Sequence, residues 1–325
     1  RLCSSAASDV YKRQIISFIC LFFLSCSSTQ LVDVSEEDQL NDLLSDIGNV
    51  EIKINANENV KKLVIKSIVS LDSRIKISFV NKIDNETLFI SNNFLDQKFE
   101  YFCKTANTYL EEITKKYLFE LQRNEEVFIF YNENFSYQAG VIEKNFPGVR
   151  LFKLDSNYDD LVKEVFELSG SYSRSNLISR LIQEEDLNFV PRPRKDFERI
   201  YIIAEYDQSK NFVPSLKFNY ILDKEIYASS QSVTKIEDRK KLLDFSDVIL
   251  TVPNSFIRND STNLDELSKL SFLQDLIIIS AIQKNNGNSQ IIEGKFANIR
   301  YSQNTCSDMS MQLVKIDNLG RFNLL

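Results

Sequence analysis

The chain has 325 residues, 43% of them hydrophobic and 26% charged, which is enough for two lobes with a sizeable core. Its formal net charge of −7 argues against non-specific binding to nucleic acid. Histidine is absent, so the usual general base, the commonest metal ligand and any Ser-His-Asp triad are excluded.

The first 25 residues do not look like part of the folded body. Residues 1–14 lack an initiator Met and resemble translated adapter sequence, so we leave them out of the fold prediction. Ile15–Leu24 is a ten-residue apolar run, too short for a membrane span but typical of a signal peptide, here residues 15–25. Cys26 follows in a sequence that resembles a bacterial lipobox, which predicts lipidation; the alternative is an ordinary secretory signal with an incidental cysteine. Ser27 in the next position favours the outer membrane, with the body facing the periplasm.

The next two regions are predicted to be a tether and an abbreviated first lobe. Residues 26–49 are polar and acidic and predict a lipidated tether with one short helix at Asp38–Ile47. Residues 50–123 have room for only a few strand–helix units. The predicted elements are an edge strand at Val50–Asn55, strands at Ile75–Val80 and Thr87–Ser91, and a helix at Phe99–Leu118, while Val60–Ser70 fits either a strand or a short helix.

The predicted helix at Phe99–Leu118 is amphipathic. Its apolar stripe, which includes Phe99, Phe102 and Leu110, is typical of a face buried in a core. The opposite face is expected to lie in solvent and carries four charged residues, namely Glu111, Glu112, Lys115 and Lys116.

Two cysteines lie beyond the N-terminal region, Cys103 and Cys306. The sequence has no C-x-x-C pair, and without histidine it shows no recognisable zinc pattern. We favour two buried thiols, and keep a disulfide as the alternative for an exported protein.

Residues 124–325 predict a second lobe with C-terminal return segments, because apolar runs of strand length alternate with helical patterns. Predicted strands are Val127–Tyr131, Val149–Leu154, Ile200–Ala204, Glu225–Ser230, Asp247–Val252, Gly294–Arg300 and Met311–Asp317. Predicted helices are Phe135–Asn145, Asp159–Leu168, Asn176–Glu185, Asp207–Tyr220 and Leu264–Lys284, with a Ser-rich break at Gly170–Arg174. Charged residues interrupt the last helix, so we expect it to be buried in the protein and not to span a membrane. The fold class is α/β with parallel sheets and two lobes, the first abbreviated, and the change of lobe falls near Leu121–Glu125.

The stretch Pro191–Ser230 carries a family resemblance. It reads PRPRKDFERIYIIAE, then LKFNYILDKEIYASS. The positions that match are Arg192, Arg194, Asp196, Tyr201, Ala204, Phe218, Tyr220, Asp223, Tyr227, Ala228, Ser229 and Ser230. This pattern resembles the C-terminal domain of the LppC/LpoA family, outer-membrane lipoproteins that activate penicillin-binding proteins.

The resemblance implies a type I periplasmic-binding-protein-like fold and a non-catalytic regulator of peptidoglycan synthesis, without a cofactor, that binds and activates a class A penicillin-binding protein. The N-terminal helical-repeat domain usual in that family is expected to be absent. An alternative on the same fold is a solute-binding lipoprotein of an ABC transporter for amino acids or similar small polar ligands.

Candidate binding residues follow the second-lobe strands, where two-lobed α/β proteins place ligands. They are Tyr131, Ser136, Tyr137, Glu205, Tyr206, Ser229, Ser230, Gln231, Pro253 and Asn254. Their hydroxyl, amide and aromatic groups suit a small polar ligand, although ordinary polar loops have the same composition. Arg192 and Arg194 can contact an acidic patch of a partner, or else lie in an exposed linker or cap carbonyl groups.

No catalytic or metal site is predicted. The sequence has no G-x-G-x-x-G, no phosphate-binding loop and no G-x-S-x-G. The acidic clusters Asp159–Asp160 and Glu184–Asp186 fit solvated helix faces better than an acid/base pair.

Overall fold

The computed structural model describes residues 49–69, 71, 74–120, 126–155, 157–183, 189–194, 196–221, 223–259, 263–285 and 288–325. These residues belong to one compact unit. The predicted signal peptide, Cys26 and the tether up to residue 48 lie outside the described residues, as do the predicted lobe change at 121–125 and the acidic cluster at 184–186.

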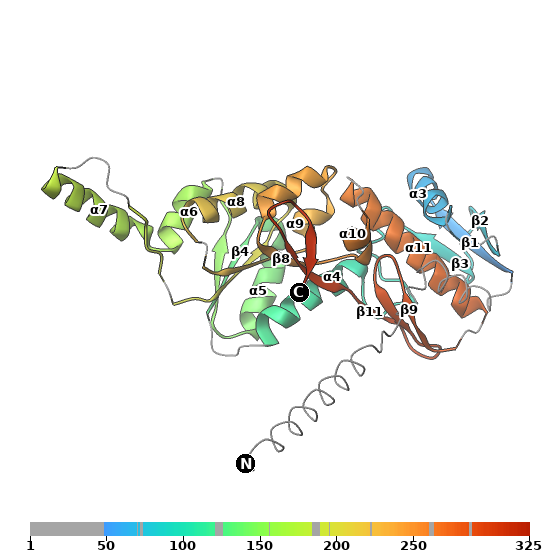
Figure 1. Cartoon of the computed structure of the whole chain (residues 1–325). Helices are drawn as coiled ribbons and strands as arrows, with labels where there is room; N and C mark the ends of the chain where they lie inside the picture. The colour runs from blue at the N-terminus through green and yellow to red at the C-terminus, as the bar shows by residue number, and fades with distance from the viewer. Residues whose placement is uncertain are drawn as a thin grey trace, which may run out of the picture. The chain divides into compact units, whose positions relative to one another are not determined.

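A seven-stranded sheet in the order β13-β12-β8-β7-β6-β4-β5 forms the largest layer (Figure 1). Its strands are β4 Val127–Tyr131, β5 Val149–Lys153, β6 Arg199–Ile203, β7 Glu225–Ala228, β8 Val248–Val252, β12 Gln312–Ile316 and β13 Phe322–Leu324. The strands from β5 to β8 are parallel, which confirms the predicted α/β class. At one edge, β12 pairs antiparallel with both β8 and β13, so the sheet is mostly parallel. A tight turn with Gly320 at φ +72° returns the chain from β12 to β13 as a hairpin, which forces that direction.

Both faces of this sheet are buried, which is why its strands read as continuous apolar runs. Phe128 and Phe130 of β4 point to one face, where Phe130 lies 4.6 Å from Phe212 of α8 (Tyr206–Phe218), measured between ring centroids. Helix α6 (Tyr158–Val165) packs against the same side. The opposite face is covered by α5 (Ser136–Asn145), which follows the short turn η1 (Glu133–Phe135), and by α4 (Ala106–Glu120).

A second, three-stranded parallel sheet has the order β2-β1-β3, with β1 Val50–Ala56, β2 Ile75–Phe79 and β3 Thr87–Ile90. The prediction that Val50–Asn55 is an edge strand is wrong, because β1 pairs on both sides. Its alternating pattern arises because only one face is fully buried. Strand β1 contacts α11 (Leu264–Lys284), which also packs against α3 (Glu58–Ile68). Helix α3 resolves the ambiguity at Val60–Ser70 and begins at Asn57, whose side chain accepts a hydrogen bond from Val60 N.

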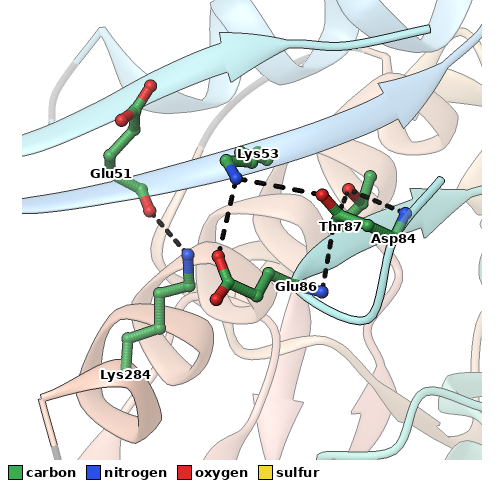
Figure 2. Close-up of polar contacts among 6 residues, drawn as sticks. All are labelled: Glu51, Lys53, Asp84, Glu86, Thr87 and Lys284. Carbon is green, nitrogen blue, oxygen red and sulfur yellow. Dashed lines mark hydrogen bonds and ion pairs between the residues drawn. The ribbon is translucent and has the colours of Figure 1, made fainter. Parts of the chain in front are cut away.

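Helix α11 is buried along most of its length, as its interrupted hydropathy predicts. Within the part of the chain that the structure describes, no helix has the length and apolar character needed to cross a bilayer. The C-terminal end of α11 is hydrogen-bonded to the three-stranded sheet, because Lys284 Nζ donates to the carbonyl of Glu51 in β1 at 2.9 Å (Figure 2).

The turn before β3 is bonded to β1 by charged groups, as Figure 2 shows. Lys53 lies 3.5 Å from Glu86 and 3.9 Å from Asp84. Thr87 Oγ1 donates to Asp84 at 2.5 Å, and this hydrogen bond lowers the pKa of that carboxyl. These contacts fix the register of β3 beside β1 at the solvent-exposed end.

The predicted helix at Phe99–Leu118 begins later than expected, at Ala106. Phe99 and Phe102 are buried as predicted, but in a loop, where their rings lie 5.8 and 6.0 Å from that of Phe272 in α11. The same loop carries a Cys103–Cys306 disulfide, so the preferred prediction of two thiols is wrong. The covalent bond joins the segment before α4 to a segment 203 residues away, which sequence spacing alone does not indicate.

The predicted Ser-rich break at Gly170–Arg174 is also wrong, because these residues are inside α7 (Leu168–Ile182). Ser173 Oγ donates to the Ser169 carbonyl one turn back at 2.9 Å, so a serine that would favour a turn is satisfied within the helix. The predicted helix at Asn176–Glu185 is the second half of α7, which ends before Gln183 at φ +59°.

A third sheet is antiparallel, with the order β11-β10-β9 and strands β9 Gln290–Glu293, β10 Asn298–Tyr301 and β11 Asp308–Ser310. The strands β9, β11 and β13, of three or four residues, were not predicted from the sequence. The other short elements are α9 Gln231–Thr234, η2 Arg239–Phe245 and α10 Asn254–Arg258.

The turn between β9 and β10 is held by a buried carboxylate. Asp275 of α11 accepts hydrogen bonds from the backbone N–H groups of Lys295, Phe296 and Ala297 at 2.9, 2.9 and 3.2 Å. Gly294 is required there, because a Cβ would lie 2.5 Å from the Ala297 carbonyl oxygen. Burial raises the pKa of Asp275 to about 7, although the three N–H groups oppose that shift.

This raised pKa predicts a pH dependence of the free energy of unfolding. The folded state holds the Asp275 proton more tightly than the unfolded chain, whose carboxyl has the ordinary pKa of 3.8. Its contribution to stability is therefore complete below pH 3.8 and is lost as the pH rises to about 7. Urea unfolding at several pH values should show the stability of the wild type, relative to Asp275→Asn, falling across that window. A difference that stays constant with pH would contradict this assignment.

Candidate functional site

A buried carboxylate lies beside two of the predicted binding residues, Ser229 and Ser230, which follow β7. Glu111 of α4 is only 7% exposed. Its Oε2 accepts a hydrogen bond from the Tyr201 hydroxyl at 2.7 Å. Its Oε1 accepts from Ser229 Oγ at 2.5 Å, from Ser230 Oγ at 2.9 Å and from Ser230 N at 3.1 Å. We call Glu111, Tyr201, Ser229 and Ser230 the Glu111 cluster.

The prediction that Glu111 lies on a solvated helix face is wrong. Helix α4 packs on the large sheet, so Glu111 points at the strands, together with Thr114, whose hydroxyl lies 2.8 Å from that of Thr251. The sheet provides hydroxyl donors in place of water, which is what a buried carboxylate requires. Burial, together with the Glu111 charge, raises the pKa of Tyr201, so this hydroxyl stays neutral and donates its proton.

The Glu111 cluster limits what this place can bind. Ser229 and Ser230 are fully buried, and the hydroxyl of each is bonded to the carboxylate. A polar ligand that used these hydroxyls would have to displace Glu111 and leave it without partners, at a cost of several kcal/mol, on the order of that for a lost buried charge pair.

The other candidate binding residues do not gather with Ser229 and Ser230. Tyr137 is 86% exposed, and Ser136 is also exposed. Tyr131 is half-buried at the end of β4. The ring of Tyr206 lies 6.0 Å from that of Phe245, with Lys210 Nζ over it at 5.1 Å.

Three further candidate residues are already engaged within the fold. Asn254 is buried, and its Nδ2 donates to the Gly294 carbonyl at 3.1 Å and to Asn298 Oδ1 at 3.0 Å. Glu205 forms an ion pair with Lys235 at 3.3 Å. The backbone N–H of Gln231 donates to Ser229 Oγ at 3.2 Å. None of the candidate ligand residues lines the pockets beside α4, beside β3 or beside α7, so their role in ligand binding stays a prediction.

The two arginines predicted to contact a partner lie in one pocket of about 550 Å³, which Arg174 of α7 also lines. Arg194 is held internally: its Nε donates to Asp196 at 2.6 Å, and its guanidinium lies 5.4 Å above the Phe128 ring. The hydrogen bond from Arg194 lowers the pKa of Asp196 to about 2. The backbone N–H of Arg192 donates to Ser171 Oγ at 3.1 Å, which positions the Arg192 side chain at the pocket.

Helix α7, which lies next to α6 in Figure 1, carries an apolar surface that was not predicted from the sequence. The side chains of Leu177, Ile178, Leu181 and Ile182 are 59, 50, 74 and 49% exposed. They form two i, i+4 pairs on neighbouring rows of the helix. The signal was present in this spacing, but assigning a break at Gly170–Arg174 hid the length of the helix. We call these four side chains the α7 apolar face.

Two more pockets are present. One, of about 850 Å³, lies between the turn before β3 and the end of α11, and its wall includes Asp84 and Glu86, which Lys53 contacts. The other, of about 710 Å³, lies beside α4. Across the described ranges, no three His, Cys, Asp or Glu side chains lie close enough together to hold a metal ion.

Comparisons with known proteins find only distant structural similarity. No protein-family model matches the sequence, and no curated protein matches it. Among solved structures, the C-domain of LpoA (YraM) from Haemophilus influenzae, a regulator of PBP1A, has a TM-score of 0.43 and 10% identity over 92% of this chain and 91% of that one. Full-length LpoA from the same organism has the same TM-score of 0.43, with 10% identity over 92% of this chain, which spans about half (53%) of its length.

A putative branched-chain amino acid ABC transporter protein from Rhodospirillum rubrum has a TM-score of 0.49 and 8% identity over 85% of this chain and 99% of that one. The chain itself has the predicted α/β architecture, with a mostly parallel sheet between helices.

We expect Glu111→Ala to lower the free energy of unfolding by about 3 kcal/mol, because it leaves the donors of Tyr201, Ser229 and Ser230 buried without an acceptor. The neighbouring Glu112→Ala is the matched control: Glu112 is 44% exposed and pairs with Lys104, so its loss should change stability by less than about 1 kcal/mol. Urea unfolding followed by circular dichroism measures both. Equal effects of the two substitutions would show that the Glu111 cluster does not stabilise the fold.

Proposed function

We propose that this protein is a non-catalytic regulator of peptidoglycan synthesis that binds and activates a class A penicillin-binding protein. The class of partner comes from the resemblance of Pro191–Ser230 to the LppC/LpoA family. The observation that favours action by contact is the Glu111 cluster, because it uses up the hydroxyls that a solute site at the ends of β6 and β7 would need. A second candidate is a solute-binding lipoprotein of an ABC transporter, and the pocket of about 710 Å³ beside α4 is the observation that favours it.

The α7 apolar face and the adjoining arginines form the contact surface in this proposal. Residues 168–182 contain Arg174 and Arg180 and no acidic residue, in a chain with a net charge of −7. Arg192, in the pocket at the base of α7, adds a third positive charge. A helix with exposed aliphatic pairs and basic neighbours fits an apolar groove with an acidic rim on the penicillin-binding protein.

The N-terminal region completes the proposal. Residues 15–25 act as a signal peptide, and Cys26 is acylated and holds the protein in the outer membrane, facing the periplasm. Residues 26–49 act as a tether, which reaches at most about 80 Å when fully extended.

The proposed contact surface can be tested by measuring partner binding. Leu177→Ser combined with Leu181→Ser should weaken binding to a purified class A penicillin-binding protein at least about tenfold, because each buried leucine contributes about 1.5–3 kcal/mol. Leu243→Ser is the control, since Leu243 is similarly exposed at 50% but lies in η2. Biolayer interferometry measures binding, and thermal unfolding should show that all variants stay folded.

The possible results distinguish the proposed synthase partner from the proposed contact surface on α7. A wild type that does not bind the synthase would overturn the proposed function. Wild-type binding with no loss in the α7 double variant would retain the function and exclude the α7 apolar face. A solute panel tested by thermal shift is the parallel experiment, because a ligand at 100 times its dissociation constant adds about 2.7 kcal/mol of stability.

The proposed acylation of Cys26 can be tested separately. During expression of the full chain in a Gram-negative host, the wild type should incorporate labelled palmitate and sediment with outer membranes, whereas Cys26→Ser should do neither. Cys103→Ser combined with Cys306→Ser is the control that retains Cys26. Equal labelling of wild type and Cys26→Ser would contradict acylation at this residue.

A further inference from the structure

A groove of about 710 Å³ lies between the exposed side of α4 and the sheet β9–β11. We call it the α4 groove. Its volume is within the range of about 300–1,000 Å³ that is typical of small-molecule sites. It contains none of the residues that the sequence predicts for ligand binding, and the Glu111 cluster lies on the opposite, buried side of the helix.

The α4 groove is positively charged although the chain is acidic overall. Four cations line it, Lys104, Lys115, Lys116 and Arg300, against two acids, Glu112 and Asp308. Both acids are already engaged. Glu112 pairs with Lys104, and Asp308 accepts a hydrogen bond from the Tyr109 hydroxyl at 3.1 Å.

Two of the cations are available for a ligand. The ammonium of Lys115 and the guanidinium of Arg300 form no hydrogen bond or ion pair with any residue that the structure describes. They belong to opposite walls of the groove, one on α4 and the other on β10. An anion in the groove can therefore be bound from both sides.

Apolar surface lies next to these cations. Phe119 and Phe146 stack with ring centroids 4.1 Å apart, and both line the groove. Ile291 of β9 is directly opposite Arg300 in the strand pairing and is 69% exposed. The groove thus offers an aromatic surface and an aliphatic side chain beside its charges.

One end of the α4 groove is fixed in position. The Cys103–Cys306 disulfide joins the segments that lead to Lys104 and to Asp308. The same segments exchange backbone hydrogen bonds, from Cys103 N to the Ser307 carbonyl at 3.1 Å and from Ser307 N to the Tyr101 carbonyl at 2.8 Å. Such preorganisation lowers the entropy that binding would otherwise cost.

We propose that the α4 groove is a binding site for a small amphipathic anion, that is, a carboxylate or phosphate attached to an apolar ring or chain. Lys115 and Arg300 bind the anionic group, and Phe119, Phe146 and Ile291 pack against the apolar part. This site is separate from the α7 apolar face, and it does not depend on the proposed synthase partner.

The test uses 3-phenylpropionate as the probe and the neutral 3-phenylpropan-1-ol as its matched analogue. Each probe is titrated into the folded protein, and the heat is measured by isothermal titration calorimetry. The anion should bind at least about tenfold more tightly than the alcohol. Lys115→Gln combined with Arg300→Gln should abolish that preference. Lys76→Gln, an exposed lysine on β2, is the control and should keep it. Ile291→Ser should weaken the binding of both probes, because it removes apolar contact and leaves the charges in place.

Three results would overturn the proposal. One is no binding of 3-phenylpropionate at about 10 mM, since a weaker interaction would contribute less than about 3 kcal/mol. Another is equal affinity for the anion and the alcohol. The third is an anion preference that persists in the Lys115 and Arg300 double variant. Synthase binding by the same double variant should match that of the wild type, which keeps this test independent of the proposed function.

Discussion

The contact between α4 and the large sheet is the interaction on which the rest of the structure depends. Glu111 accepts four hydrogen bonds from Tyr201, Ser229 and Ser230, which belong to or follow β6 and β7. Near the other end of the helix, the Leu118 carbonyl accepts a hydrogen bond from Arg199 at the start of β6. The helix therefore lies along the strands with its direction fixed at both ends. Because a buried carboxylate without donors costs several kcal/mol, the helix cannot rotate or slide without a large loss of stability.

This fixed helix has two sides with different roles. Its inner side completes the second core layer of the sheet, where Leu118 packs with Ile129 and Ile203. Its outer side forms one wall of the α4 groove and carries Lys115 and Phe119. A ligand in that groove would therefore contact a helix whose position is set by the opposite side, and binding would require little rearrangement of the fold.

The sequence predicted the parallel strands well, because strands buried on both faces produce continuous apolar runs such as Ile200–Ala204. It could not predict the Glu111 cluster, since Glu111 and Glu112 have the same local setting and only the tertiary packing of α4 decides which of them is buried. It misplaced the start of α4 for a similar reason. Phe99 and Phe102 continue the apolar spacing of the helix, but they pack on Phe272 from a loop that the disulfide holds. Long-range partners of this kind leave no periodic signal.

The distribution of charge separates the two binding surfaces from the remainder of the molecule. A chain with net charge −7 places basic groups around α7 and in the α4 groove, and in both places apolar side chains accompany them. Elsewhere, Arg194 pairs with Asp196 and Lys53 with Glu86. Lys115 and Arg300 differ in that they meet no such partner among the described residues. In both places, basic side chains lie beside exposed apolar side chains. Binding to an acidic and partly apolar partner requires this combination.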